Sequence, residues 1–152
     1  MATSIQLVFD TADPGREAEF WAAALHYELQ PPPGDYATWD EFLRAEHVPE
    51  SEWNDSSAIV DPEGKGPRVY FQKVPEGKTA KNRLHLDVSA RTTRDEAVAA
   101  AVADGATVIG DFRKPDGTGW VTLTDPEGNE FCIERGASER APQAPGRYRI
   151  GT

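Results

Sequence analysis

The sequence predicts an α+β fold built from two tandem βαβββ modules, whose eight strands form an open mixed barrel or cup. The first observation is a repeated tetrapeptide, Asp-Pro-Glu-Gly, at residues 61–64 and 125–128. Each copy joins two apolar strand-like runs, and proline followed by glycine is the chemistry of a tight turn. An amphipathic helix pattern also precedes the turn in each half. Together these observations indicate an internal duplication.

The first module is expected over about residues 4–75. A strand at 5–9 leads into a helix that has Asp13 as its N-cap and Pro14 at its first position. A short strand at 26–29 ends at the Pro-Pro-Pro-Gly run of 31–34. Strands at 57–60 and 68–74 then form a hairpin around the first turn. The stretch of about 35–56 has no counterpart in the second half, so we interpret it as an insertion whose aromatic residues are candidates for a lid.

The second module, residues 83–136, repeats this order. A strand at 83–88 precedes Thr93 and Glu96, which have the spacing of a capping box, and the helix that follows ends at Gly105. Further strands are expected at 107–109, 120–124 and 130–135. Residues 1–136 therefore form a single domain, followed by a C-terminal tail at 137–152.

Composition limits the partners and the compartment. The net charge of −10 and the sequence pI of about 4.7 argue against nucleic acid and anionic membranes as partners. Cys132 is the one cysteine, so no internal disulfide can form. We find no signal-peptide pattern and no apolar run long enough to span a membrane. A cytoplasmic protein is the resulting prediction.

Strand alternation predicts which side chains share a face. The helices need an apolar sheet face, which we expect to contain Ile5, Leu7, Phe9, Val69, Phe71, Leu84, Leu86, Val88, Phe131 and Ile133. The opposite face then contains Gln6, Tyr70, Gln72, His85, Asp87, Trp120, Cys132 and Glu134. If a twofold relates the modules, Gln6 corresponds to His85 and Tyr70 to Cys132. We expect these four side chains to converge in one cup.

The order of these segments resembles a known superfamily. The Ile-Gln-Leu-Val-Phe-Asp run at 5–10, the Asp-Pro-Gly-Arg-Glu-Ala-Glu-Phe-Trp run at 13–21, Arg-Leu-His-Leu-Asp-Val at 83–88 and Leu-Thr-Asp-Pro-Glu-Gly-Asn-Glu-Phe at 123–131 are similar to the vicinal oxygen chelate superfamily. That superfamily includes glyoxalase I, the bleomycin- and fosfomycin-resistance proteins and the extradiol dioxygenases. The resemblance covers about residues 4–136, is closest to small actinobacterial glyoxalase-like proteins, and implies the glyoxalase/bleomycin resistance/dihydroxybiphenyl dioxygenase fold.

The resemblance also implies where a metal would bind. The four ligand positions of metal-dependent members fall on Gln6, Tyr70 (with Gln72 as the alternative), His85 and Cys132. The family usually has glutamates at the second and fourth positions, and a hard divalent ion prefers carboxylate and imidazole ligands. We therefore predict no metal and no other cofactor, with a divalent metal as the alternative.

The site residues follow from this face and from the insertion. His85 and Tyr70 are the candidate catalytic residues, and packing is the alternative role for each. The candidate ligand-binding residues are Gln6, Gln72, Cys132, Glu134, Trp120, Trp39 and Trp53, of which the tryptophans would form an aromatic wall.

Three functions are compatible with these residues. The first is binding of a small organic molecule in the cup without a catalytic metal. The second is an enzyme, either a lyase or isomerase or a metal-dependent enzyme, that uses His85 with Gln6 and Tyr70. The third is a regulatory or interaction domain. A homodimer is implied by the resemblance and favoured by exposed sheet edges.

Overall fold

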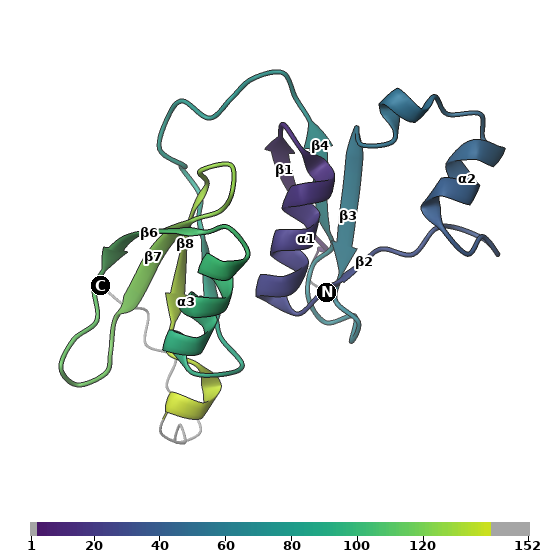
Figure 1. The fold of residues 1–152 in the computed structure, drawn as a ribbon. Helices are drawn as coiled ribbons and strands as arrows, with labels where there is room; N and C mark the ends of the chain where they lie inside the picture. Colours follow the sequence, from purple (N-terminus) through teal and green to yellow (C-terminus); the bar gives the residue numbers. More distant parts are fainter. Residues whose placement is uncertain (1–2, 141–152) are drawn as a thin grey trace.

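The computed structural model describes residues 3–140, which form two four-stranded mixed sheets, each with one long helix (Figure 1). The first sheet has the order β1-β4-β3-β2, in which β1 is an edge strand that pairs with β4 in parallel. The second sheet has the equivalent order β5-β8-β7-β6, again with a parallel first pair. The sheets are open, and the predicted duplicated α+β fold is confirmed. Within residues 3–140 the helices are too short or too polar to cross a membrane.

The elements of the first module are β1 (Leu7–Thr11), α1 (Pro14–Leu25), β2 (Glu28–Leu29), α2 (Trp39–Ala45), the 3-10 helix η1 (Glu50–Glu52), β3 (Ser56–Val60) and β4 (Val69–Lys73). Those of the second are β5 (Leu86–Ser89), α3 (Arg94–Ala103), β6 (Thr107–Asp111), β7 (Trp120–Thr124), β8 (Glu130–Glu134) and the 3-10 helix η2 (Ala137–Glu139). Residues 141–152 of the predicted tail lie outside the described residues.

The predicted helix caps are present. The Asp13 side chain accepts a hydrogen bond from the backbone N–H of Arg16, and Thr93 and Glu96 form the reciprocal capping box. The expected strand at 26–29 is shorter than predicted. His26 instead ends α1 in a left-handed conformation, φ 56°, because its N–H bonds carbonyls of the last helical turn.

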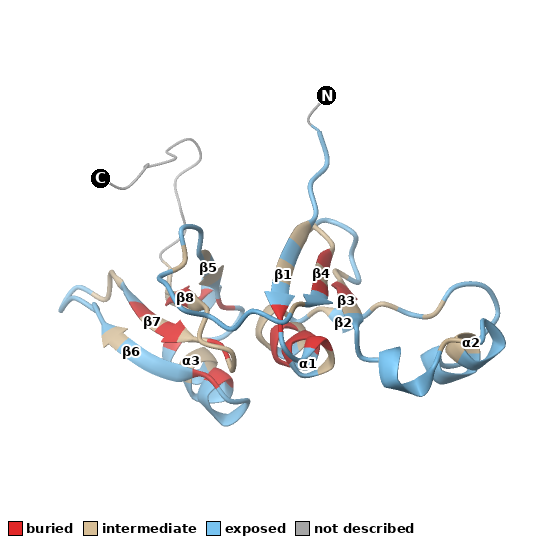
Figure 2. Cartoon of the chain, turned by 90° about the horizontal axis from the view of Figure 1, so that it is seen from above, coloured by how far each residue is buried: buried red, intermediate tan, exposed pale blue. Residues whose placement is uncertain are grey.

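Trp21 links the cores of the two modules. Its ring lies 5.2 Å from that of Phe9 in the first sheet and 5.0 Å from that of Phe131 in the second, measured between centroids. Buried residues accordingly concentrate in α1 and the strands beside it, whereas α2 lies at the outside (Figure 2). Ile5 and Leu84, expected on the apolar face, are each 70% exposed. They precede the first paired residues of β1 and β5, so the sheets do not hold them against the helices.

The two Asp-Pro-Glu-Gly turns connect the modules reciprocally. Glu127, in the second turn, accepts hydrogen bonds from the Thr11 hydroxyl at 2.5 Å and from the backbone N–H groups of Ala12 and Asp13. Glu63, in the first turn, pairs with Arg91, in the equivalent loop before α3, at 3.4 Å. Each turn therefore reaches the strand–helix loop of the other module, as a pseudo-twofold requires.

Candidate functional site

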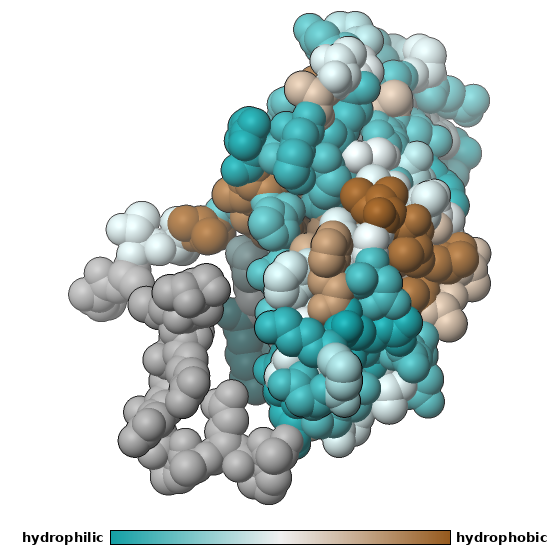
Figure 3. Space-filling view, turned by 90° about the vertical axis from the view of Figure 1, so that its left-hand side faces the viewer, coloured by the Kyte–Doolittle hydropathy of each residue, from teal (hydrophilic) through white to brown (hydrophobic). Residues whose placement is uncertain are grey.

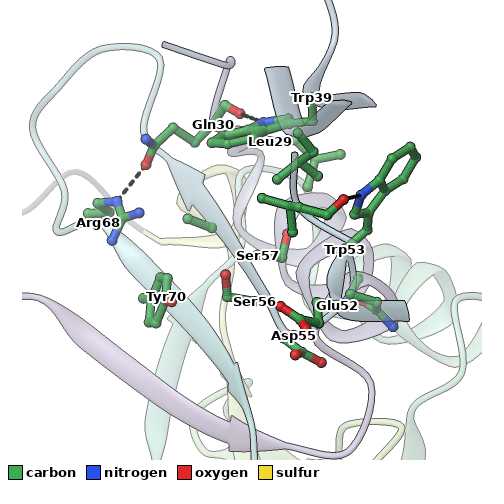
Figure 4. Close-up of a pocket in the computed structure, with 15 residues that line it drawn as sticks. Leu29, Gln30, Trp39, Glu52, Trp53, Asp55, Ser56, Ser57, Arg68 and Tyr70 are labelled. Atoms are coloured by element: carbon green, nitrogen blue, oxygen red, sulfur yellow. Dashed lines mark hydrogen bonds between the residues drawn. The ribbon is translucent and has the colours of Figure 1, made fainter. Parts of the chain in front are cut away.

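The first candidate site is a cavity of about 400 Å³ between the insertion and the first sheet, here called the insertion cavity (Figure 4). Its apolar lining comes mainly from the insertion, which also supplies Glu52, Asn54 and Asp55, and its other polar residues come from β3, β4 and the turns beside β2 and β4. The lining residues are Gly15, Leu29, Gln30, Trp39, Leu43, Val48, Glu52, Trp53, Asn54, Asp55, Ser56, Ser57, Ala58, Arg68 and Tyr70. A volume of this size is typical of small-molecule sites.

Backbone acceptors hold the two tryptophans of this cavity. The indole N–H of Trp39 donates to the Gln30 carbonyl at 2.6 Å, and that of Trp53 donates to the Val48 carbonyl at 3.0 Å. The Arg44 guanidinium lies 4.9 Å from the centre of the Trp53 ring. Because the polar atom of each indole is already bonded to a backbone carbonyl, the rings offer the cavity apolar surface.

Arg68 contributes the positive charge in the cavity lining. Its Nε donates to the Gln30 side-chain oxygen at 2.5 Å, and its Nη1 donates to the Gln6 side-chain oxygen at 2.6 Å. Its guanidinium carbon lies 5.1 Å from the centre of the Tyr70 ring. Among the described residues, no carboxylate forms an ion pair with Arg68. The guanidinium is therefore held by neutral groups only.

The second candidate site is a cavity of about 570 Å³ on the second sheet, here called the second-sheet cavity. It is lined by Lys81, His85, Asp87, Trp120, Thr122, Glu130, Phe131, Cys132 and Glu134. The Nε2 atom of His85 lies 3.3 Å from Oδ1 of Asp87. Nitrogen, oxygen and sulfur atoms of His85, Asp87 and Cys132 all lie within 4.8 Å of one another.

Cys132 is a neutral thiol in this setting. Burial raises the pKa of the thiol above its ordinary value, and the negative charges of Asp87 and Glu134 raise it further. Thr122 Oγ1 lies 3.5 Å from the sulfur and lowers the pKa less than burial raises it. A nucleophilic thiolate therefore has no support here.

The structure distributes the predicted site residues over two cavities. The insertion cavity contains Tyr70, Trp39 and Trp53, and the second-sheet cavity contains His85, Cys132, Glu134 and Trp120. Gln6 binds Arg68, whereas the Gln72 amide donates to Asp10 at 2.7 Å, and neither glutamine lines either cavity.

Strand register supports the predicted equivalence. Leu7 pairs with Val69 as Leu86 pairs with Phe131, so Gln6 corresponds to His85 and Tyr70 to Cys132. The four side chains nevertheless do not line one shared hollow.

Sequence reasoning missed Arg68 as a site residue. Arg68 and Tyr70 are two residues apart, and strand alternation would have placed them on the same face. Strand alternation places Asp87 on the correct face, but Asp87 is not among the predicted site residues. The register explains its position, since Asp87 is the direct partner of Cys132.

The four positions implied by the family do not fit a hard divalent ion. The Gln6 oxygen already accepts a hydrogen bond from a guanidinium, whose charge would repel a metal ion. Tyr70 and the Cys132 thiol supply no negative charge in place of the two glutamates. The separate group of His85, Asp87 and Cys132 has the donor atoms that Zn²⁺ uses, namely nitrogen, carboxylate oxygen and sulfur.

Comparison with known proteins supports the fold. Fosfomycin resistance protein FosX from Mesorhizobium loti superposes with a TM-score of 0.60 at 11% identity, over 90% of this chain and 94% of that chain. A glyoxalase/bleomycin resistance protein/dioxygenase family enzyme from Burkholderia phytofirmans PsJN gives 0.55 at 18% identity, over 85% and 94%. Hypothetical protein SA1046 from S. aureus gives 0.56 at 15%, over 89% and 98%.

A search of curated proteins finds no significant match. A family model described as a glyoxalase-like domain matches residues 6–134, which span both modules. The resemblance seen in the sequence is thereby confirmed, and the chain belongs to the glyoxalase-like domain family.

Proposed function

We propose that this glyoxalase-like domain binds a small organic molecule in the insertion cavity and needs no catalytic divalent metal to do so. The observation that supports this proposal is the cavity itself, about 400 Å³ with two indole rings and one arginine in its lining. Apolar walls with a few placed polar groups are the usual composition of a ligand site. The insertion that supplies the indoles has no counterpart in the second module.

Tryptophan variants test this proposal. Ligands selected by thermal shift should bind to protein treated with a chelator as tightly as to untreated protein, and the Trp39→Ala and Trp53→Ala variants should weaken binding at least about tenfold. Trp120→Ala is the matched control, because Trp120 lies in the other cavity beside Phe112, with ring centroids 5.6 Å apart. Equal weakening by all three variants, or binding only after metal is added, would contradict the proposal.

A second candidate function is catalysis by His85. The observation that favours it is the His85–Asp87 contact of 3.3 Å at the second-sheet cavity, since a carboxylate can orient an imidazole that moves a proton. The enzyme would be a lyase or isomerase, with Zn²⁺ at His85, Asp87 and Cys132 as the metal-dependent form. Heat released on titration with Zn²⁺ in a calorimeter would show that the metal binds. Turnover that is lost in His85→Ala but kept in Tyr70→Phe would favour this function over binding alone.

We also propose that the protein is a cytoplasmic homodimer. Strand β6 is a sheet edge, and large apolar side chains gather on this side of the molecule (Figure 3). Val108, Ile109, Phe112 and Trp120 are each at least 43% exposed. Exposed apolar edges commonly pair with another chain. Light scattering in solution measures the mass directly, and a monomer at micromolar concentration would contradict this assembly.

A further inference from the structure

We infer that the ligand of the insertion cavity is an anion, specifically a flat aromatic carboxylate whose carboxylate binds Arg68. The inference rests on the proposed function and adds the chemical class of the ligand. Arginine has five N–H donors, and the bonds to Gln6 and Gln30 use one on Nη1 and the one on Nε. The Nη2 donors and the second Nη1 donor remain for a ligand.

The charge of Arg68 is not neutralised by the protein. Both of its side-chain partners are uncharged amide oxygens, and the ring below it belongs to Tyr70. Arg68 is half-buried, so water screens its charge less than that of a fully exposed arginine. An anion placed against the free N–H groups would gain charge-assisted hydrogen bonds, and a carboxylate fits the planar guanidinium with two parallel bonds.

The acidic residues of the cavity lie at its other end. Figure 4 shows Glu52 and Asp55 grouped below Trp53, across the two serines from Arg68. Asp55 is paired with Lys73 at 3.3 Å, so its charge is largely compensated. The chain as a whole carries −10, but charges beyond about 8 Å are screened at physiological ionic strength. The local charge at the Arg68 end is therefore positive.

The rest of the lining fits an aromatic body. Trp39 and Trp53 present ring surface, since their N–H groups are bonded to the backbone carbonyls of Gln30 and Val48. A flat ring system would gain apolar burial and stacking there while its acid group reaches Arg68. Arg68 thus provides a fixed positive charge at this end of the cavity, where its Nη1 is bonded to Gln6.

A panel of bicyclic and tricyclic aromatic carboxylates, each paired with its own primary carboxamide, tests the inference. Tryptophan fluorescence and calorimetry measure binding to the full chain. The carboxylates should bind about tenfold to a hundredfold more tightly than the matched amides, the range expected for a charge-assisted bond. Rising ionic strength should weaken the carboxylates and leave the amides unchanged. Equal affinity of acids and amides would overturn the inference.

Variants of Arg68 test whether the preference for carboxylates over amides depends on this residue. Arg68→Gln should remove the preference for the carboxylate, and Arg68→Lys should retain part of it because the charge remains. Arg91→Gln is the matched control, since it also removes one positive charge but Arg91 pairs with Glu63 and does not line the cavity. A preference that survives in Arg68→Gln would overturn the inference. If acids and amides bind equally and both depend on Trp53, only the inference fails. No binding by any member of the panel also overturns the inference, whereas the proposed function fails only if the ligands selected by thermal shift bind independently of Trp39 and Trp53.

Discussion

Replacing Glu17 by glutamine should remove a large pH dependence of stability. Glu17 lies on α1 and is fully buried, and neither of its carboxyl oxygens has a hydrogen-bond partner among the described residues. The nearby Asp125 carboxylate accepts a hydrogen bond from the Trp21 indole at 3.2 Å and two from the Asn129 side chain. Burial, followed by the negative charge of Asp125, raises the pKa of Glu17 from 4.5 to about 9.

The sign of the effect follows from this raised pKa. Between pH 4.5 and 9 the folded protein keeps a proton on Glu17 that the unfolded chain has released, so the free energy of unfolding falls as the pH rises. At 1.36 kcal/mol for each pH unit above 4.5, the cost at pH 7 is at most about 3.4 kcal/mol. Carboxyl groups whose pKa is lowered, such as those of Asp13 and Glu130, release their protons mostly below pH 5 in both the folded and the unfolded chain. They therefore contribute little to the pH dependence of stability between pH 5 and pH 7.

Urea unfolding followed by tryptophan fluorescence measures this effect at pH 5 and at pH 7. At pH 5 a protonated Glu17 and a glutamine have nearly the same shape and charge, so Glu17→Gln should change stability by no more than about 1 kcal/mol. At pH 7 the variant should be more stable than the unmodified protein by about 2–3 kcal/mol. Glu19→Gln, on the exposed side of the same helix, is the control. An identical pH slope in Glu17→Gln and the unmodified protein would refute this reasoning.

Three further predictions concern contacts between segments that are distant in the sequence. Glu127→Ala should lower the free energy of unfolding by roughly 2–3 kcal/mol, because it leaves several donors of the first module without an acceptor. Glu63→Ala should lower it by under about 1 kcal/mol, because its partner Arg91 is exposed, and urea unfolding compares the two variants. Gly136→Ala should destabilise the protein by about 3 kcal/mol or more, since an added Cβ would lie 1.5 Å from the backbone oxygen of Thr92. Gly77→Ala, where an added Cβ would meet open space, should change stability by no more than about 0.5 kcal/mol, and thermal melts measure both variants. The Cys132 thiol should react with iodoacetamide at pH 7.5 more slowly than a free thiol, because burial raises the pKa of Cys132. Rapid alkylation of the folded protein would contradict this prediction.

Local patterns in the sequence were sufficient for the fold. The repeated turns, the capping box at Thr93 and the alternation along strands such as β1, β5 and β7 are short-range signals, and the structure contains them. The exposed Ile5 and Leu84 show the limit of such signals. Alternation assigns a residue to one face of a strand but does not predict where strand pairing begins. A side chain packs against the helix only where its strand is paired in the sheet.

The functions of the two turns needed the three-dimensional structure. The sequence identifies Asp125 and Glu127 only as turn residues. Their partners, Trp21 and Thr11, lie 104 and 116 positions away in the other module. No local pattern encodes such a pairing. The duplicated turns therefore stabilise the arrangement of the modules as well as each hairpin, and the burial of Glu17 beside Asp125 is a consequence of that packing.

The positive charge of the insertion cavity could not be predicted from the sequence for the same reason. Arg68 is the first residue of the predicted strand at 68–74, but its partners come from separate segments, Gln6 before β1 and Gln30 after β2. The sequence, with its excess of acidic residues, gives no sign that an arginine remains without a carboxylate. Once the chain is folded, the only ionic group at that end of the cavity among the described residues is a cation. A site built this way discriminates by charge first and by ring shape second, so removing Arg68 should change which ligands bind before it changes how much apolar surface they bury.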